Sequence, residues 1–126
     1  MITKMYLNQA EIYSIIRNYY TTNDNYVTVY SKISICGEDV SIYFYVQENT
    51  NNTKVVLELT TEDLFNVLNK YLNNRELELV NFKNIGHVKK IEGYVNKDIP
   101  VFDGVELQVR NRSIHKKLSK IININK

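Results

Sequence analysis

The fold is decided by one stretch, Tyr26-Val-Thr-Val-Tyr-Ser-Lys-Ile-Ser-Ile-Cys-Gly-Glu-Asp-Val-Ser-Ile-Tyr-Phe-Tyr-Val-Gln47, which has the pattern of a β-hairpin. Side chains of a strand alternate between two faces, so each register can be tested against the pattern. A four-residue loop at Cys36-Gly-Glu-Asp39 pairs apolar residues with one another: Ile35 with Val40, Ile33 with Ile42, Val29 with Val46. Phe44, also on the apolar face, is left opposite Ser31. On the other face the same register pairs Tyr30 with Tyr45 and Lys32 with Tyr43.

Two capped helices are predicted around this hairpin. Asn8 with Glu11, and Thr60 with Asp63, have the spacing of a capping box, in which the cap and the third helical residue satisfy each other's backbone N–H groups. The apolar residues that follow each cap have helical spacing and predict two buried stripes: Ile12, Ile15, Ile16 and Tyr19; Leu64, Leu68, Tyr71 and Leu72.

The remaining strands are less regular. A third strand from about Lys54 to Leu59 would add Val55, Leu57 and Leu59 to the apolar face of the hairpin. Residues 77–82 are predicted as a strand in which Leu77 and Leu79 lie on one face and Val80 and Phe82 on the other. Apolar residues on both faces are typical of a strand that is covered on both sides. Residues 85–100 are predicted as a loop with a short strand at 87–91, Asp103-Gly104 as a turn, and Val105, Leu107 and Val109 as a last strand.

The resulting order, α-β-β-β-α-β-(β)-β-α, indicates an α+β domain with an antiparallel sheet of about four to six strands and two or three helices. Residues 1–112 are predicted to form a single domain. The last helix is expected at 113–126, a basic amphipathic segment or tail docked on that domain, because Ile114, Leu118, Ile121 and Ile122 have helical spacing.

Composition favours a cytoplasmic protein. One cysteine among 126 residues cannot form an internal disulfide, which fits a reducing compartment. The first residues lack a signal-peptide pattern, and no run approaches the ~20 apolar residues that cross a bilayer, so no membrane association is expected. Asparagine occurs 17 times and alanine once, a bias that AT-rich codons produce. The sequence therefore suggests a phage or mobile element of a low-GC bacterium.

Charge is uneven along the chain. Residues 1–80 carry six Lys or Arg against ten Asp or Glu, whereas residues 81–126 carry ten against four, so the halves have net charges of −4 and +6. The two halves either balance within one domain or create a dipolar surface that steers an anionic partner.

The first candidate site is the tyrosine face, which we define as Tyr26, Tyr30, Lys32, Tyr43 and Tyr45. Flat aromatic rings beside a cation resemble in composition a stacking platform for nucleic-acid bases. Tyrosine also suits a protein interface, since it covers a large area at low entropic cost. A third interpretation is structural: tyrosine has high strand propensity, and a helix could cover this face.

The second candidate is the basic segment, with Arg110, Arg112, Lys116, Lys117 and Lys120 and no carboxylate from residue 110 to the end. It could bind phosphates or an acidic protein in a salt-dependent manner, or it could be a solvated tail. The apolar residues at 114, 118, 121 and 122 argue against simple solvation, because they require burial on this chain or on a second copy.

Catalytic patterns are weak. His87 and His115 lack metal-ligand spacing with Cys36, and nothing near Cys36 would activate its thiol, because Glu38 and Asp39 disfavour the thiolate. Among four glycines no phosphate loop, dinucleotide fingerprint or nucleophile elbow occurs. We therefore expect no catalytic residues, no metal and no cofactor.

These observations favour a small non-enzymatic interaction protein that binds another protein or itself, for example as a homodimer. The alternative is a nucleic-acid-binding protein that uses the tyrosine face and the basic segment. A minor alternative is a small-molecule-binding domain or enzyme with a pocket between sheet and helices.

Overall fold

The computed structural model describes residues 1–21, 26–37, 39–50 and 53–111. Within these ranges the elements are β1 (Ile2–Asn8), α1 (Gln9–Tyr20), β2 (Tyr26–Cys36), β3 (Asp39–Thr50), β4 (Thr53–Glu58), α2 (Thr61–Asn73), β5 (Leu77–Ile91) and β6 (Lys97–Asn111). The strands form two antiparallel sheets, ordered β1-β6-β5 and β2-β3-β4. The α+β class is confirmed, but the single sheet is wrong. Neither described helix is long and apolar enough to cross a membrane.

The β2–β3 hairpin has the register that the sequence predicts. Each expected pair is present, including Tyr30 with Tyr45 and Phe44 with Ser31. Cys36 also pairs with Asp39, so the connection is shorter than the predicted four-residue loop. The pairing of the two strands is still the predicted one, because the register depends on the match of apolar residues and not on the length of the loop.

Both helices begin as predicted. Asn8 and Thr60 each accept a hydrogen bond from the third helical residue, and that residue's carboxylate accepts one from the backbone N–H of the cap. The predicted stripes are buried except that Tyr19 is exposed and Tyr71 is half-buried, while Val67 is buried instead. Tyr19 stays near solvent because it lies at the rim of the contact between the two helices.

β5 corrects one interpretation of the sequence. The apolar residues of 77–82 change parity because of a bulge between Leu79 and Asn81, and not because the strand is covered on both faces. Leu79 pairs with Val109 and Phe82 with Leu107, so both face the core, while Val80 is exposed. One extra residue in a strand has this effect on the alternation.

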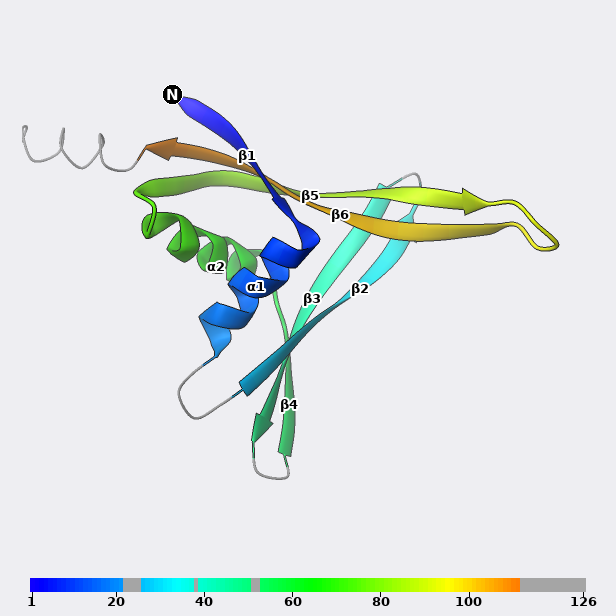
Figure 1. Cartoon of the computed structure of the whole chain (residues 1–126), viewed down its shortest axis with the longest axis horizontal. Coiled ribbons are helices and arrows are strands. Elements are labelled where there is room, and N and C mark those ends of the chain that lie inside the picture. The colour runs from blue at the N-terminus through cyan, green and yellow to red at the C-terminus, as the bar shows by residue number, and fades with distance from the viewer. Residues whose placement is uncertain (22–25, 38, 51–52, 112–126) are drawn as a thin grey trace, which may run out of the picture.

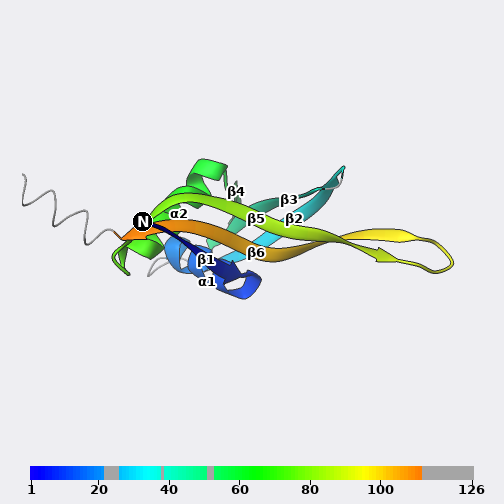
Figure 2. The ribbon, with the colours of Figure 1, turned by 90° about the horizontal axis from the view of Figure 1, so that it is seen from above.

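The short strand predicted at 87–91 is present as the end of β5, but most of the predicted loop at 85–100 and the turn at Asp103-Gly104 are wrong. β5 continues to Ile91, β6 starts at Lys97, and Gly104 lies inside β6 beside a second bulge. The two strands form a long hairpin whose tip, yellow in Figure 1, extends beyond the rest of the molecule, as Figure 2 also shows. The sequence did not indicate strands of this length, because the bulges and the polar residues between them interrupt the alternation of apolar and polar residues.

Two further differences concern the ends of the chain. The strand β1 was not predicted, because only Leu7 is buried in it and Met5 half-buried, which gives too short an alternation. It pairs with β6 from Ile2 opposite Arg110 to Asn8 opposite Gly104. The helix predicted at 113–126 lies outside the described residues.

The core lies between the inner face of the β1-β6-β5 sheet, the two helices and the apolar face of the other sheet (Figure 1). Its largest fully buried side chains are Leu7, Ile12, Ile16, Val27, Val67, Leu68, Leu72, Val105 and Leu107. The two sheets meet where Phe44 contacts Phe102 and where Gly86 lies against Val40. A Cβ on Gly86 would come within 2.8 Å of the Val101 carbonyl oxygen and 3.0 Å of Val40 Cγ1, so this close approach requires glycine.

Candidate functional site

The tyrosine face is assembled as the hairpin register predicts. Its five residues lie on one side of β2 and β3, opposite the side that carries Val27, Phe44 and Val46 into the core. Side chains alternate between the two faces of a strand, so Tyr26, Tyr30 and Lys32, which are an even number of residues apart, share one face of β2. Pairing with β3 places Tyr43 and Tyr45 on the same face.

The centre of the tyrosine face is an ordered aromatic pair. Tyr30 and Tyr45 stack with ring centroids 5.2 Å apart and an angle of 10° between the planes. Lys32 Nζ lies 5.2 Å from the centroid of the Tyr45 ring, within the range of a cation–π contact. These contacts restrict the side chains before any partner binds, which lowers the entropic cost of binding.

No described helix or strand covers the tyrosine face. Tyr26 is 67% exposed and Tyr43 45% exposed, and Lys32 is also exposed, whereas the stacked rings of Tyr30 and Tyr45 are half-buried. Helix α1 lies on the opposite side of the hairpin, where the Tyr13 hydroxyl hydrogen-bonds to the Ser31 hydroxyl. Of the alternatives that the sequence left open, coverage of this face by α1 or α2 is therefore not what the described part of the chain has.

The edge strand β4 departs from the burial that its pattern predicts. Val55 and Leu57 lie on the apolar side of the sheet, as their pairing with Glu48 and Val46 shows, but they are 51% and 44% exposed. Val56, on the side of the tyrosine face, is 50% exposed. Leu59, which follows the strand, is buried.

The basic segment is represented in the described residues by Arg110 alone; Arg112, Lys116, Lys117 and Lys120 lie outside them. Arg110 is in β6, where its Nε and Nη2 donate to the two carboxylate oxygens of Glu78 at 2.9 and 3.0 Å. This hydrogen bond and the charge of Glu78 raise the pKa of Arg110 above its ordinary value. Arg110 is therefore paired with Glu78 within the β1-β6-β5 sheet and is not part of the tyrosine face.

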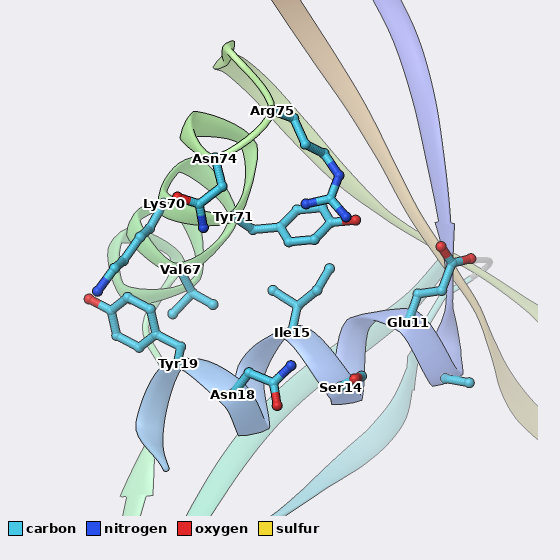
Figure 3. Close-up of a pocket in the computed structure, with 11 residues that line it drawn as sticks. Glu11, Ser14, Ile15, Asn18, Tyr19, Val67, Lys70, Tyr71, Asn74 and Arg75 are labelled. Atoms are coloured by element: carbon cyan, nitrogen blue, oxygen red, sulfur yellow. The ribbon is translucent and has the colours of Figure 1, made fainter. Parts of the chain in front are cut away.

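A cleft between α1 and α2, with a volume of about 690 Å³, was not predicted (Figure 3). Two cations line it over aromatic rings: Lys70 Nζ is 5.2 Å from the Tyr19 centroid, and Arg75 Cζ is 3.9 Å from that of Tyr71. A smaller cavity of about 340 Å³ lies between β3, α2 and β5. Neither the cleft nor the cavity can be predicted from the sequence, because both depend on how elements that are distant in the chain pack against one another.

One pair of potentially catalytic groups was also missed. His87 Nδ1 lies 2.7 Å from Asp103 Oδ2, across the bulge between β5 and β6, and both side chains are partly exposed. Cys36 is exposed and contacts the Ser41 hydroxyl at 3.1 Å. The described residues contain no cluster of three or more His, Cys, Asp or Glu that could hold a metal ion. A histidine–carboxylate pair orients an imidazole, and catalysis would further require a nucleophile or a bound substrate beside it.

Comparison of the chain with protein-family models, with curated proteins and with solved structures finds no match. The argument for function therefore depends on the surfaces described above.

Proposed function

We propose that this is a small, non-enzymatic, cytoplasmic interaction protein that binds another protein or a second copy of itself through the tyrosine face. The observation that supports this most directly is an ordered aromatic surface that no described element covers. Tyrosine is enriched in protein interfaces because its ring buries a large area while its hydroxyl group remains able to hydrogen-bond.

The order within the tyrosine face supports an interface more than a purely structural role. A stacked aromatic pair contributes about 0.5–1.5 kcal/mol beyond the burial of its area, which stabilises the hairpin. That contribution explains Tyr30 and Tyr45, but it does not explain why Tyr26 and Tyr43 add further exposed rings beside them. An interface accounts for all four tyrosines.

The proposal is tested with the double substitution of Tyr30 and Tyr45 to serine. We expect weaker self-association in light scattering, or weaker capture of a protein partner in a pull-down, with an unchanged circular dichroism spectrum. Tyr94→Ser is a matched control, because Tyr94 is exposed in the connection between β5 and β6, away from the tyrosine face. Association that persists in the double variant would count against this function.

A second candidate function is nucleic-acid binding. The observation in its favour is the Lys32 ammonium beside the stacked pair, which places a cation where a phosphate would lie if a base stacked on the rings. Arg110 does not add to this surface, because it is paired with Glu78 on the other sheet. The test is a mobility shift with single-stranded oligonucleotides. Affinity should fall steeply between low and moderate salt, and no shift at low salt would eliminate this candidate.

A further inference from the structure

The outer edge of β4 has no strand paired to it in the described chain. β4 is last in the order β2-β3-β4 and pairs only with β3 there. Residues 54–58 are all exposed, and Val55, Val56 and Leu57 present apolar side chains on both faces of the strand. An exposed apolar edge strand without proline is a template for pairing with another strand.

The backbone of β4 has a defined set of outward-facing groups. The Leu59 N–H donates to the Phe44 carbonyl oxygen at 2.9 Å, which continues the β3–β4 ladder by one residue. In an antiparallel pair the residues that bond to the neighbouring strand alternate with residues that point away from it. Counting back from Leu59, the N–H and C=O groups of Lys54, Val56 and Glu58 therefore point to the outer edge.

The side chains of the same three residues are self-complementary. We propose that β4 pairs in antiparallel orientation with β4 of a second copy of this chain, with Val56 opposite its own counterpart. Lys54 then lies opposite Glu58 of the second copy at both ends of the contact. Within the described residues neither Lys54 nor Glu58 has an ion-pair partner.

Charge selects this register over the others that the backbone permits. Symmetric pairing centred on Val55 or on Leu57 also matches outward-facing groups with outward-facing groups. Those registers place Lys54 or Glu58 opposite Val56, and the opposite charges no longer meet. Only the register centred on Val56 aligns both charged residues with opposite charges, a cross-strand arrangement that stabilises a sheet.

The apolar side of β4 also fits this pairing. Val55 lies opposite Leu57 of the second copy in a non-hydrogen-bonded pair, the type in which side chains approach most closely. Two such pairs would cover the side chains that the helices leave exposed. The result is a continuous six-stranded sheet with the two tyrosine faces on the same side. The inference goes beyond the proposed function, because it places self-association at the edge of β4 and leaves the tyrosine face open to another protein.

The test exchanges the two charges one at a time and together. Lys54→Glu leaves two negative charges on β4, and Glu58→Lys leaves two positive charges, so each variant should weaken dimerisation about tenfold at low salt, measured by light scattering against concentration. The double variant Lys54→Glu/Glu58→Lys should return to within about threefold of the unchanged chain. An equal mixture of the two single variants should also dimerise. Lys89→Glu, an exposed charge change on β5, is the control and should have no effect.

Three outcomes would overturn the inference. The first is an unchanged chain that remains monomeric at its highest soluble concentration; the proposed function would then still hold for a different protein partner. The second is dimerisation that the single charge variants do not weaken. The third is a dimer that the tyrosine substitutions abolish and the charge variants leave intact, which would assign self-association to the tyrosine face.

Discussion

Phe44 and Phe102 join the two sheets, with ring centroids 5.5 Å apart and an angle of 75° between the ring planes. Both rings are buried, and Tyr13 of α1 contacts Phe44 edge-on from the other side, with centroids 6.2 Å apart. The Phe44 side chain thus contacts both the other sheet and a helix. Its cross-strand partner in the hairpin, Ser31, is polar.

Replacement of Phe102 by alanine should therefore be severely destabilising. We expect the free energy of unfolding to fall by about 3–5 kcal/mol, because a buried ring is lost and a cavity remains. Urea denaturation measures the change. Val95→Ala, in the exposed connection between β5 and β6, should change it by about 0.5 kcal/mol or less. A loss at Phe102 similar to that at Val95 would show that this contact does not hold the sheets together.

The sequence predicted those parts of the fold that depend on neighbours in the chain. The hairpin register follows from alternation over two adjacent strands, and both helix starts follow from a cap and a carboxylate three residues apart. Each of these signals is complete within about 20 residues. The tyrosine face was predicted for the same reason.

The remaining parts depend on long-range packing. The bulges at Val80 and Asp103 shift the alternation of β5 and β6, so the local pattern resembled a two-sided strand, a loop and a turn. The division into two sheets arises because β6 pairs with β1, which lies about 100 residues earlier in the chain. The exposure of Val55 and Leu57 likewise depends on where the helices end, which no pattern within β4 records.

The capping boxes give a second prediction, on stability. Asn8→Ala and Thr60→Ala should each lower the free energy of unfolding by about 1 kcal/mol, because a backbone N–H at the helix start loses its acceptor. Asn8→Asp and Thr60→Ser retain an acceptor oxygen and should cost only a few tenths of that amount. Thermal or urea unfolding measures both effects. Equal stability of the alanine and the conservative variants would refute the role of the caps.

Gly104 supports a third prediction. Its φ is 153°, and a Cβ at this position would lie 2.3 Å from the Leu7 carbonyl oxygen and 2.6 Å from the Tyr6 hydroxyl oxygen. The backbone conformation alone should make Gly104→Ala unfavourable by about 1–3 kcal/mol, and the clash with the backbone of β1 adds to this cost. Hydrogen exchange should show β1 losing protection first, since it pairs with β6 at this residue.

Gly93→Ala is the matched control for Gly104. No atom lies within 4 Å of a Cβ added at Gly93, which is in the connection between β5 and β6. The free energy of unfolding should therefore change by no more than about 0.5 kcal/mol. If the two alanine variants were equally stable, the close approach of β1 to Gly104 would not be a constraint on the fold.

The fourth prediction concerns alkaline pH. Burial, followed by the charges of Asp63 and Tyr19, raises the pKa of Tyr20 above its ordinary value of 10.0. In the unfolded chain this tyrosine loses its proton near the ordinary value, whereas in the folded chain it retains the proton to higher pH. The unfolded state therefore binds fewer protons in this window, and stability should fall as the pH rises through about 10 toward the raised pKa.

Tyr20→Phe removes the ionisable group and should reduce the alkaline loss of stability, by at most the slope that one proton produces. Chemical denaturation at a series of pH values from neutral to alkaline measures the slope. Ultraviolet titration of tyrosinate should show that one tyrosine with a raised pKa is missing from the variant. Tyr94→Phe is the matched control, because it removes a hydroxyl group from a fully exposed tyrosine in the connection between β5 and β6. The same slope in both variants would mean that the burial of Tyr20 does not control its ionisation.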